Sequence, residues 1–294
     1  MLSDPLRTAL ETAISRATGA PLAIRRATAA SGGCIHSSWV LESGDTRYFA
    51  KTNDARFAET FAAEADGLVA LGGAGIRVPR PVTQGEADGK AFLVLEYLAL
   101  GRGTDTAFRE LGRRLARLHA HHGSEFGWHR DNFIGLTAQS NTPRAAWTGF
   151  WQTERLAPQL ALAARNGHGG ELQSLGKQLI DAVPDLLAGR APAPSLLHGD
   201  LWDGNAGFVR DGTPVVFDPA VYYGDPEADL AMTELFGGFP QSFYDGYWEL
   251  RATDQGYRQR RELYNLYHVL NHLNLFGGAY LAQAERMMVR LLAA

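Results

Sequence analysis

Two aspartates and an asparagine have the types and spacing that phosphoryl transfer requires. Asp200 and Asn205 lie in the run His198–Asn205 (HGDLWDGN), and Asp218 follows the apolar run Val215–Phe217, eighteen residues after Asp200. A carboxylate in such a loop accepts the proton of a hydroxyl group, while an asparagine on the same turn and a second carboxylate hold Mg²⁺ against phosphate oxygens. The set therefore predicts Asp200 as the base, and Asn205 and Asp218 as the metal ligands, of phosphate transfer to an alcohol.

The spacing in this run is that of the catalytic loop of protein kinases. His198, Asp200 and Asn205 fit the pattern His-x-Asp-Leu-x-x-x-Asn, with Gly199 where protein kinases have arginine. A His-Gly-Asp triplet alone is more often a turn with a capping aspartate. Because Asn205 and Asp218 are both in register, the catalytic interpretation is favoured.

A lysine and a glutamate upstream supply a charge pair suited to a nucleotide. Lys51 ends the strand-like run Tyr48–Lys51, where a point charge suits α- and β-phosphate oxygens. Kinases fix this lysine with a glutamate on a helix. Glu64 borders the apolar face of the helical segment 55–71, whereas Glu59 is the competing choice. We expect Glu64 to pair with Lys51 and Glu59 to be a solvated surface residue.

A glycine-rich run precedes these strands. In Ser31–Ser37 (SGGCIHS), Gly32, Gly33 and Cys34 would bring backbone N–H groups close to phosphate. The run lacks the Gly-Lys-Ser/Thr ending of a Walker loop, and two glycines more often mark an ordinary turn. Its position ahead of two strands and Lys51 favours a nucleotide-binding role.

A buried strand ends the front part of the chain. The run Ala91–Tyr97 (AFLVLEY) is apolar except for Glu96. We expect it to lead into a hinge where backbone groups of Glu96 and Leu98 pair with the adenine edge. A plain core strand is compatible with the same pattern.

The chain changes from strand-rich to helix-rich after this strand. Short strand-like runs flank a turn at Ser43–Asp45. Helical periodicity recurs in the segments 108–118, 150–164, 172–187 and 262–276. We therefore expect an α+β two-lobed fold, with a small β-rich N-lobe over residues 1–97 and a larger, mainly helical C-lobe over residues 98–294. A ligand cleft is expected at their junction.

The amino-acid composition limits the kinds of molecule that the protein is expected to bind. Of the 294 residues 45% are hydrophobic, enough for a sizeable core, and 28 Lys and Arg against 32 Asp and Glu give a net charge of −4. This balance argues against nucleic acid and against a polybasic membrane patch. The single cysteine fits a reducing cytosol, and the apolar stretch Ala91–Leu100 is about half the length of a membrane span. We expect a soluble cytoplasmic protein, a monomer or weak dimer.

Taken together, the segments resemble the fructosamine kinase (ketosamine-3-kinase) family, a branch of the protein-kinase-like and aminoglycoside-phosphotransferase-like fold. The resemblance runs nearly from end to end. It covers Ser31–Ile35, Phe126–Asn141 (FGWHRDNFIGLTAQSN), Trp147–Leu160, His198–Asn205, Phe217–Gly238 (FDPAVYYGDPEADLAMTELFGG) and Asn271–Met288. Two residues depart from the family pattern, since Ser31 replaces a frequent glycine and His36 replaces a small polar residue.

The resemblance implies an ATP-dependent kinase that uses Mg²⁺. It implies phosphorylation of the 3-hydroxyl of a ketose attached to an amine, either a small molecule or a protein lysine. The 3-phosphate is unstable and sheds the sugar, so the result is deglycation. In this resemblance Asp200 is the catalytic base, Asn205 and Asp218 are the metal ligands, and Lys51 and Glu64 anchor phosphate. A family tendency toward redox-sensitive loop cysteines makes Cys34 a candidate redox switch.

Other side chains have weaker signals. Trp202, two residues after Asp200, is a candidate wall for the sugar-amine, with packing in the rear core as the alternative. His268 and His272 share a helix face and are candidate substrate contacts, with core packing favoured. Asp229 is expected to brace the catalytic loop through backbone N–H groups. His119 and His122 share a face at a helix end, where the helix dipole explains them better than a metal does.

Two other functions stay open. One is a small-molecule kinase of the same fold that acts on an aminoglycoside, choline or homoserine, against which Trp202 and the block Phe126–Asn141 count. The other is a non-catalytic nucleotide-binding module, although none of the lysine, base and metal aspartate is missing. The sequence leaves open whether the sugar is fructose, ribulose or erythrulose, and whether the amine is free or protein-bound.

Overall fold

The computed structural model describes all residues except 1, 31–35, 253–255 and 294. Its N-terminal part contains a five-stranded antiparallel sheet in the order β1-β2-β3-β5-β4. The strands are β1 (Arg26–Ala30), β2 (Ser37–Ser43), β3 (Thr46–Asp54), β4 (Pro81–Ala87) and β5 (Lys90–Glu96). Two helices accompany the sheet, α1 (Asp4–Thr18) and α2 (Ala58–Gly73), the second preceded by a 3₁₀ turn at Ala55–Phe57.

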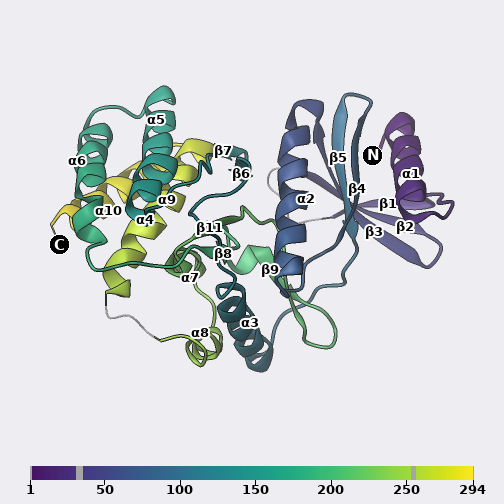
Figure 1. Cartoon of the computed structure of the whole chain (residues 1–294). Coiled ribbons are helices and arrows are strands. Elements are labelled where there is room, and N and C mark those ends of the chain that lie inside the picture. The colour runs from purple at the N-terminus through teal and green to yellow at the C-terminus, as the bar shows by residue number, and fades with distance from the viewer. Residues whose placement is uncertain (1, 31–35, 253–255, 294) are drawn as a thin grey trace.

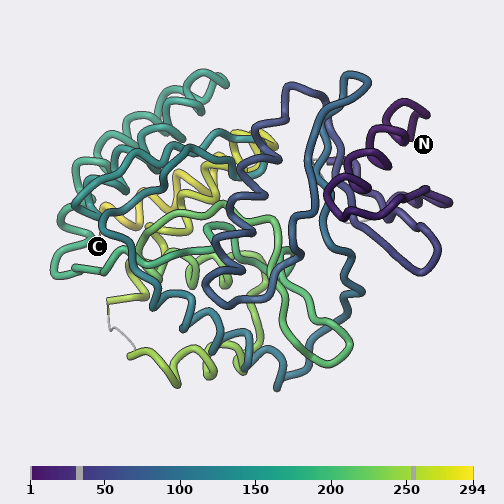
Figure 2. Tube along the Cα trace, turned by 45° about the vertical axis from the view of Figure 1, so that its right-hand side comes forward, coloured from purple at the N-terminus to yellow at the C-terminus, as the bar shows by residue number. Residues whose placement is uncertain are grey.

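Alternation along β5 explains why both faces of the sheet are covered. Phe92 and Val94 pack in the core cluster of α1, while Leu93 and Leu95 pack in the cluster of α2. Successive side chains of a strand point to opposite faces, so a core on both sides requires an unbroken apolar run. Figures 1 and 2 show α1 at the outer side of the sheet and α2 between the sheet and the rest of the chain.

The remainder of the chain is mainly helical. Its helices are α3 (Asp105–Leu118), α4 (Trp147–Phe150), α5 (Ala157–Arg165), α6 (Glu171–Leu186), α7 (Pro226–Leu235), α8 (Gln241–Trp248), α9 (Tyr257–Phe276) and α10 (Leu281–Leu292). Three two-stranded ribbons lie among them: β6 (Asn132–Ile134) with β7 (Thr137–Gln139), β8 (Ser195–Leu197) with β11 (Tyr222–Gly224), and β9 (Ala206–Phe208) with β10 (Pro214–Val216). Short 3₁₀ turns lie at Asp203–Asn205 and Gly278–Tyr280. The expected α+β fold, with a sheet-containing front and a helical rear, is therefore confirmed.

The predicted helix 150–164 is not regular. It starts at Trp147 as α4, widens into a π-helical turn at Trp151–Leu156, and continues as α5. The wide turn contains the fully buried Arg155, whose guanidinium lies 4.0 Å from the ring centre of Tyr222. Such turns occur mostly as single interruptions within α-helices, and periodicity alone does not reveal them.

Helices α3 and α8 touch each other through glycines. A Cβ atom on Gly112 would overlap the backbone carbonyl oxygen of Phe243, and a Cβ atom on Gly246 would overlap that of Arg109. The contact is reciprocal, since each helix presents a glycine to the backbone of the other. It sets the position of Tyr247, the residue after Gly246, relative to α3.

Candidate active site

The predicted base Asp200 and the predicted metal ligand Asn205 lie on the catalytic loop, which joins β8 to β9. Gly199 has a φ of 82°, and a Cβ atom there would overlap the carbonyl oxygen of Ala220. Only glycine therefore fits this position without a shift of the backbone. The backbone N–H of Ala220 donates to the carbonyl of His198 at 2.9 Å. The loop is thus held directly against the segment that follows Asp218.

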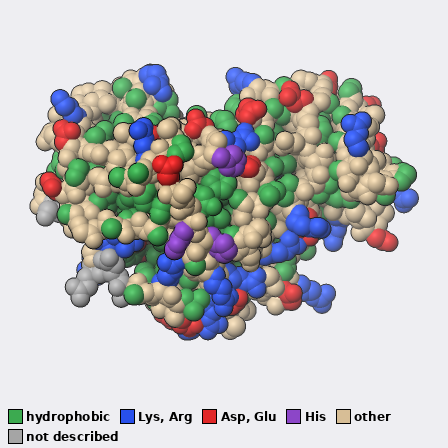
Figure 3. All heavy atoms as spheres, viewed as in Figure 1, with side chains coloured by type: hydrophobic (Ala, Val, Ile, Leu, Met, Phe, Trp, Pro, Cys, Tyr) green, Lys and Arg blue, Asp and Glu red, His purple; other side chains and the backbone are tan. Residues whose placement is uncertain are grey.

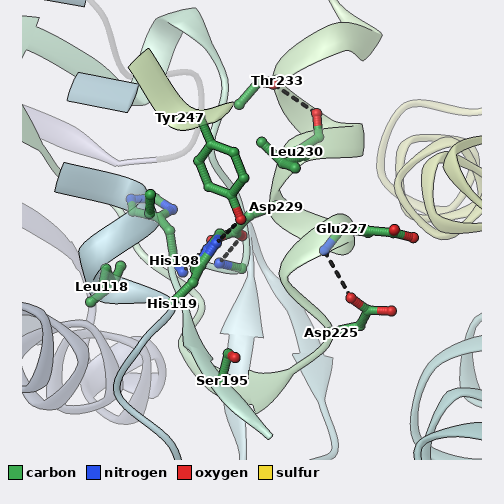
Figure 4. A network of polar contacts seen from close by, with 12 residues as sticks. Leu118, His119, Ser195, His198, Asp225, Glu227, Asp229, Leu230, Thr233 and Tyr247 are labelled. Atoms are coloured by element: carbon green, nitrogen blue, oxygen red, sulfur yellow. Dashed lines mark hydrogen bonds and ion pairs between the residues drawn. The ribbon is translucent and has the colours of Figure 1, made fainter. Parts of the chain in front are cut away.

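A buried chain of polar groups supports this loop from behind (Figure 4). Asp229 on α7 accepts hydrogen bonds from the backbone N–H groups of His198 at 2.7 Å and Gly199 at 2.8 Å. His119 Nε2 lies 3.2 Å from Asp229 Oδ2, and the hydroxyl of Tyr247 lies 2.8 Å from His119 Nδ1. The expected bracing role of Asp229 is confirmed by these bonds.

The protonation of this chain follows from its donors and acceptors. Burial lowers the pKa of His119, so its ring is neutral. Burial works against the charge of Asp229, but hydrogen bonds from His119 and the loop hold the pKa of Asp229 below its ordinary value. An ionised carboxylate only accepts, so His119 Nε2 carries the proton and Tyr247 donates to Nδ1.

Asp200 and Asn205 lie side by side in the loop. Asn205 Nδ2 donates to the backbone carbonyl of Asp200 at 2.8 Å and lies 3.2 Å from its Oδ2. Burial, followed by the negative charge of Asp218, raises the pKa of Asp200 to about 7. A carboxyl group with that pKa is suited to take up a proton near neutral pH.

Lys51, Glu64 and Asp218 form one ionic cluster. Lys51 Nζ on β3 lies 2.7 Å from Glu64 Oε1 on α2 and is also paired with Asp218 Oδ1. Burial opposes the charge on Lys51, but Asp218 and Glu64 outweigh it and raise the pKa of Lys51 above its ordinary value. Burial raises the pKa of Glu64 to about 7, against the opposing effect of Lys51. Glu59, the competing choice, instead pairs with Arg130 at the surface.

Asp218 is held in a rare backbone conformation. Its φ is 55°, in the left-handed region that non-glycine residues seldom adopt. The carboxylate is 45% exposed, in contrast to the 7% of Lys51 and the 9% of Glu64. Strain of this kind is often found at functional sites. Here it accompanies a carboxylate that pairs with Lys51 and still faces solvent.

The donor set around Asp218 fits a hard cation such as Mg²⁺. Asp218 offers an exposed carboxylate, and the Asn205 amide is turned so that its nitrogen faces Asp200. No hydrogen bond to Asn205 Oδ1 is found among the residues that the structure describes. Carboxylate and amide oxygens are the ligands that Mg²⁺ prefers, with phosphate and water completing its shell.

Three predicted nucleotide contacts, Gly32, Gly33 and Cys34, lie outside the described residues. At the end of β5, the Glu96 N–H donates to the Arg80 carbonyl at 2.8 Å, and the Glu96 side chain pairs with Arg77 and Arg80. The backbone N–H of Glu96 is therefore already hydrogen-bonded within the protein, and only its carbonyl is left for the predicted adenine contact. Leu98 follows β5 and is half-buried.

The candidate substrate residues lie on the loop that contains Asp200 and on α9. Trp202 is 37% exposed, which argues against the alternative that it packs in the core. Its ring faces Phe236 at 6.1 Å between centroids, and Phe236 faces His272 at 4.8 Å. His268 is buried and its Nδ1 lies 4.0 Å from Asp200 Oδ1.

Two residues that lie near the candidate site residues, Phe236 and His36, were not predicted as such from the sequence. Phe236 belongs to the block Phe217–Gly238, but nothing in the pattern separates it from core aromatics. His36 contacts Asn53 and the ring of Phe61, and burial and then the charge of Lys51 lower the pKa of His36 to about 4. The only signal for His36 was its departure from the family pattern.

Two further observations concern metals and membranes. His119 is engaged with Tyr247 and Asp229, and the described residues contain no cluster of three or more His, Cys, Asp or Glu side chains able to hold a metal. Among the helices in the described ranges, none is both long and apolar enough to cross a bilayer.

The two-part architecture, in which Lys51 pairs with Glu64 and Asp218 while Asp200 lies beside Asn205, is that of an ATP-dependent phosphotransferase with a kinase-like fold. Residues 6–294 match the profile of the fructosamine kinase family. The chain belongs to that family.

Individual relatives agree with this assignment. A probable ketoamine kinase of Synechocystis is 47% identical over 95% of this chain and 94% of its own length. The chloroplastic protein-ribulosamine 3-kinase of Arabidopsis thaliana is 37% identical over 97% of this chain and 86% of its own.

Solved structures give the same result for the fold. A Haemophilus somnus protein, provisionally named a fructosamine-3-kinase, has a TM-score of 0.89 at 29% identity and covers 96% of both chains. An aminoglycoside phosphotransferase has a TM-score of 0.64 at 16% identity over 96% of this chain and 98% of its own, which shows a shared fold.

Proposed function

We propose that this protein phosphorylates the 3-hydroxyl of ketosamines with ATP and thereby initiates their deglycation. The observation that carries the proposal is the convergence of Asp200 and Asn205 with the Lys51–Glu64–Asp218 cluster in a chain of the fructosamine kinase family. The printed names of the relatives, ketoamine kinase and protein-ribulosamine 3-kinase, support the same class of substrate.

In the proposed reaction, Asp200 accepts the proton of the 3-hydroxyl as that oxygen bonds to the γ-phosphorus of ATP. The bond between the γ-phosphorus and the bridging oxygen breaks, and ADP leaves with the electron pair. The raised pKa of Asp200 makes its carboxylate a stronger base than an exposed aspartate. Elimination of inorganic phosphate from C3 of the product, followed by hydrolysis of the sugar–amine bond by water, releases the free amine.

Nucleotide binding is assigned to the N-lobe, residues 1–97, and to its hinge. Lys51, held by Glu64, neutralises α- and β-phosphate oxygens. Phosphate contacts are assigned to the backbone of Gly32, Gly33 and Cys34 from the sequence alone, because these residues lie outside the described ranges. The adenine is assigned to the Glu96 carbonyl and the Leu98 N–H. Asn205 and Asp218 would hold Mg²⁺, which would supply positive charge against the phosphates.

The amine-bearing side of the acceptor is assigned to the C-lobe, residues 98–294. Trp202 is proposed as a wall against the sugar-amine, supported by Phe236 and His272. A secondary amine is cationic at neutral pH, and an exposed indole face attracts such a charge. His268 borders Asp200 from α9.

The test is a panel of acceptors under one assay. Purified protein is incubated with Mg²⁺ and ATP together with fructosyl-lysine, ribulosyl-lysine, choline, homoserine or an aminoglycoside, and ADP release is followed. We expect turnover with one or both ketosamines, a sugar 3-phosphate signal in ³¹P NMR, and no turnover when Mg²⁺ is chelated. Turnover restricted to choline, homoserine or the aminoglycoside would contradict the proposal.

A further inference from the structure

The two carboxylates that hold Lys51 come from different parts of the chain. Glu64 lies on α2, and Asp218 lies on the loop after β10. The distance between these elements decides whether Lys51 meets both carboxylates. One segment, residues 126–141 with the ribbon β6–β7, contacts both elements, and we call it the bracket.

On one side, the bracket is bonded to α2. The indole Nε1 of Trp128 donates to Asp66 Oδ2 at 2.8 Å, two residues along α2 from Glu64. The Trp128 ring also lies 5.3 Å from the ring of Tyr223 on β11, so this side chain connects α2 to the C-lobe. Arg130 also pairs with Glu59, but the Glu59 side chain is 78% exposed, so solvent screening leaves this pair little weight in the attachment.

On the other side, the bracket is bonded to the chain just after Asp218. Asn132 Nδ2 donates to the Val221 carbonyl at 2.7 Å, and Gln139 Nε2 donates to the Ala220 carbonyl at 3.2 Å. Gln139 Nε2 also donates to Asn132 Oδ1 at 2.7 Å. Both amides are buried, so losing either partner would leave a backbone carbonyl without its hydrogen bond.

Further groups fix the orientation of these amides. Tyr267 donates to Gln139 Oε1 at 2.6 Å, which turns Nε2 toward Ala220. Asn141 Nδ2 donates to Asn132 Oδ1 at 2.9 Å, and the buried Arg155 donates to Asn141 Oδ1 at 2.8 Å. A connected buried network of this kind tends to specify one arrangement.

The two sides of the bracket also meet directly. A Cβ atom on Gly67 of α2 would lie 3.1 Å from the Pro219 side chain and 3.3 Å from that of Val221. Helix α2 therefore rests against the residues that follow Asp218, and the bracket is bonded to both partners of this contact.

We propose that Trp128, Asn132 and Gln139 are positioning residues for phosphoryl transfer. Trp128 acts through Asp66 and α2 on Glu64, while Asn132 and Gln139 act through the backbone of Ala220 and Val221 on Asp218. The bracket thereby keeps Lys51 in its nucleotide-binding position. The inference rests on the proposed function.

The test compares the Michaelis constants for ATP and for the ketosamine at saturating Mg²⁺. Trp128→Phe keeps a ring but removes the indole N–H, and Asp66→Ala removes its acceptor. We expect both variants to raise the ATP KM about tenfold with little change in the ketosamine KM, since positioning couplings are worth several-fold to a few tens-fold. Asp66→Asn keeps an acceptor oxygen and is expected to restore the ATP KM to within about twofold of wild type.

A matched control lies on the same helix. Glu59→Ala removes the exposed pair with Arg130 and is expected to leave both constants unchanged. Should Trp128→Phe fail to fold, the Asp66→Ala and Asp66→Asn pair decides the question, because Asp66 is part-exposed. An unchanged ATP KM in Asp66→Ala, or an equal rise in both constants, would overturn the proposal.

The wild-type reaction separates this inference from the proposed function. If wild type turns over no ketosamine, the proposed function fails. If wild type is active while Asp66→Ala matches it in both constants, the bracket fails and the proposed function stands.

Discussion

Asp200 carries a carboxyl group whose surroundings disfavour its charge. Burial and the neighbouring Asp218 raise its pKa to about 7, and one amide, that of Asn205, partly compensates. An unfolded aspartate titrates near its ordinary value of about 3.9. The folded protein is therefore less stable with this group ionised, and the stability cost grows as pH rises from about 4 to about 7.

The substitution Asp200→Asn should separate activity from stability. The amide accepts no proton, so turnover is expected to fall about 10²–10⁴-fold, the usual value of general-base catalysis. At pH 8 the melting temperature is expected to rise, because a disfavoured charge is removed. The rise should shrink toward pH 4, where wild-type Asp200 is protonated in the folded state.

The measurement is kcat together with thermal melts at pH 4, 6 and 8. Near wild-type turnover with chemistry rate-limiting would show that Asp200 is not the base. A melting temperature shift that is the same at every pH would show that the charge is not the cause.

Trp202 allows a second residue-scale prediction. Its ring is 37% exposed and lies over Gly204, where a Cβ atom would be in conflict with the indole. Trp202→Ala is expected to raise the ketosamine KM and leave the ATP KM nearly unchanged. Burying a core tryptophan is typically worth ~3–5 kcal/mol, so a large fall in melting temperature without a selective KM effect would favour a packing role instead.

At the scale of elements, three helices converge on the catalytic loop. Tyr247 from α8 donates to His119 from the end of α3, and His119 donates to Asp229 from α7. Tyr247→Phe removes the hydroxyl and leaves the buried Nδ1 of His119 without a partner, at a cost of about 1–3 kcal/mol.

We expect Tyr247→Phe to lower the melting temperature by a few degrees and to reduce kcat more than either KM, because the loop loses its fixed position while both ligands still bind. Tyr244→Phe is the control, since Tyr244 lies on the same helix but contacts Thr233 instead. Equal effects of the two substitutions would contradict a specific role of Tyr247 in holding the loop.

The elements also show what the sequence predicts and what it does not. The helices α3, α6 and α9 and the β2–β3 hairpin were predictable because their apolar patterns extend over several turns or alternations. Strands β6 and β7 have three residues each, which is too short for an alternating pattern to be recognised. The π-helical turn at Trp151–Leu156 contains the buried Arg155, and no periodic pattern predicts it.

The candidate site divides in the same way. Asp200, Asn205, Asp218 and Lys51 were predictable because local spacing encodes their chemistry. Glu64 and Asp229 were predictable as supports too, but the more distant links were not: Tyr247 is 128 residues from His119, and Trp128 is 62 residues from Asp66. Such pairs follow from the packing of helices, and no local pattern marks them.

At the scale of the whole molecule, acidic and basic side chains are mixed over the visible face, in keeping with the small net charge (Figure 3). The chain contains one cysteine, Cys34, so oxidation has one thiol to act on. Cys34 lies outside the described residues, but the glycine-rich sequence predicts a phosphate-binding turn there, whose N–H groups would favour the thiolate and hence reactivity. We propose that oxidation caps Cys34 or links two molecules through it.

Diamide or peroxide is expected to lower ATP-dependent activity of the wild type, with recovery in dithiothreitol and a shift on a non-reducing gel if a dimer forms. Cys34→Ser should resist both effects. Equal inactivation of the two proteins would exclude the switch, because the chain holds no other thiol.

The glycine contact between α3 and α8 has a consequence for how this sequence is able to diverge. Neither Gly112 nor Gly246 accommodates a methyl group without moving the opposite backbone. A related sequence with a larger side chain at either position must have α8 shifted. The shift would also move Tyr247, which is bonded through His119 and Asp229 to the catalytic loop. The two glycines at the α3–α8 contact are therefore expected to be retained as long as the catalytic loop is, and a substitution at one restricts which substitutions the other tolerates.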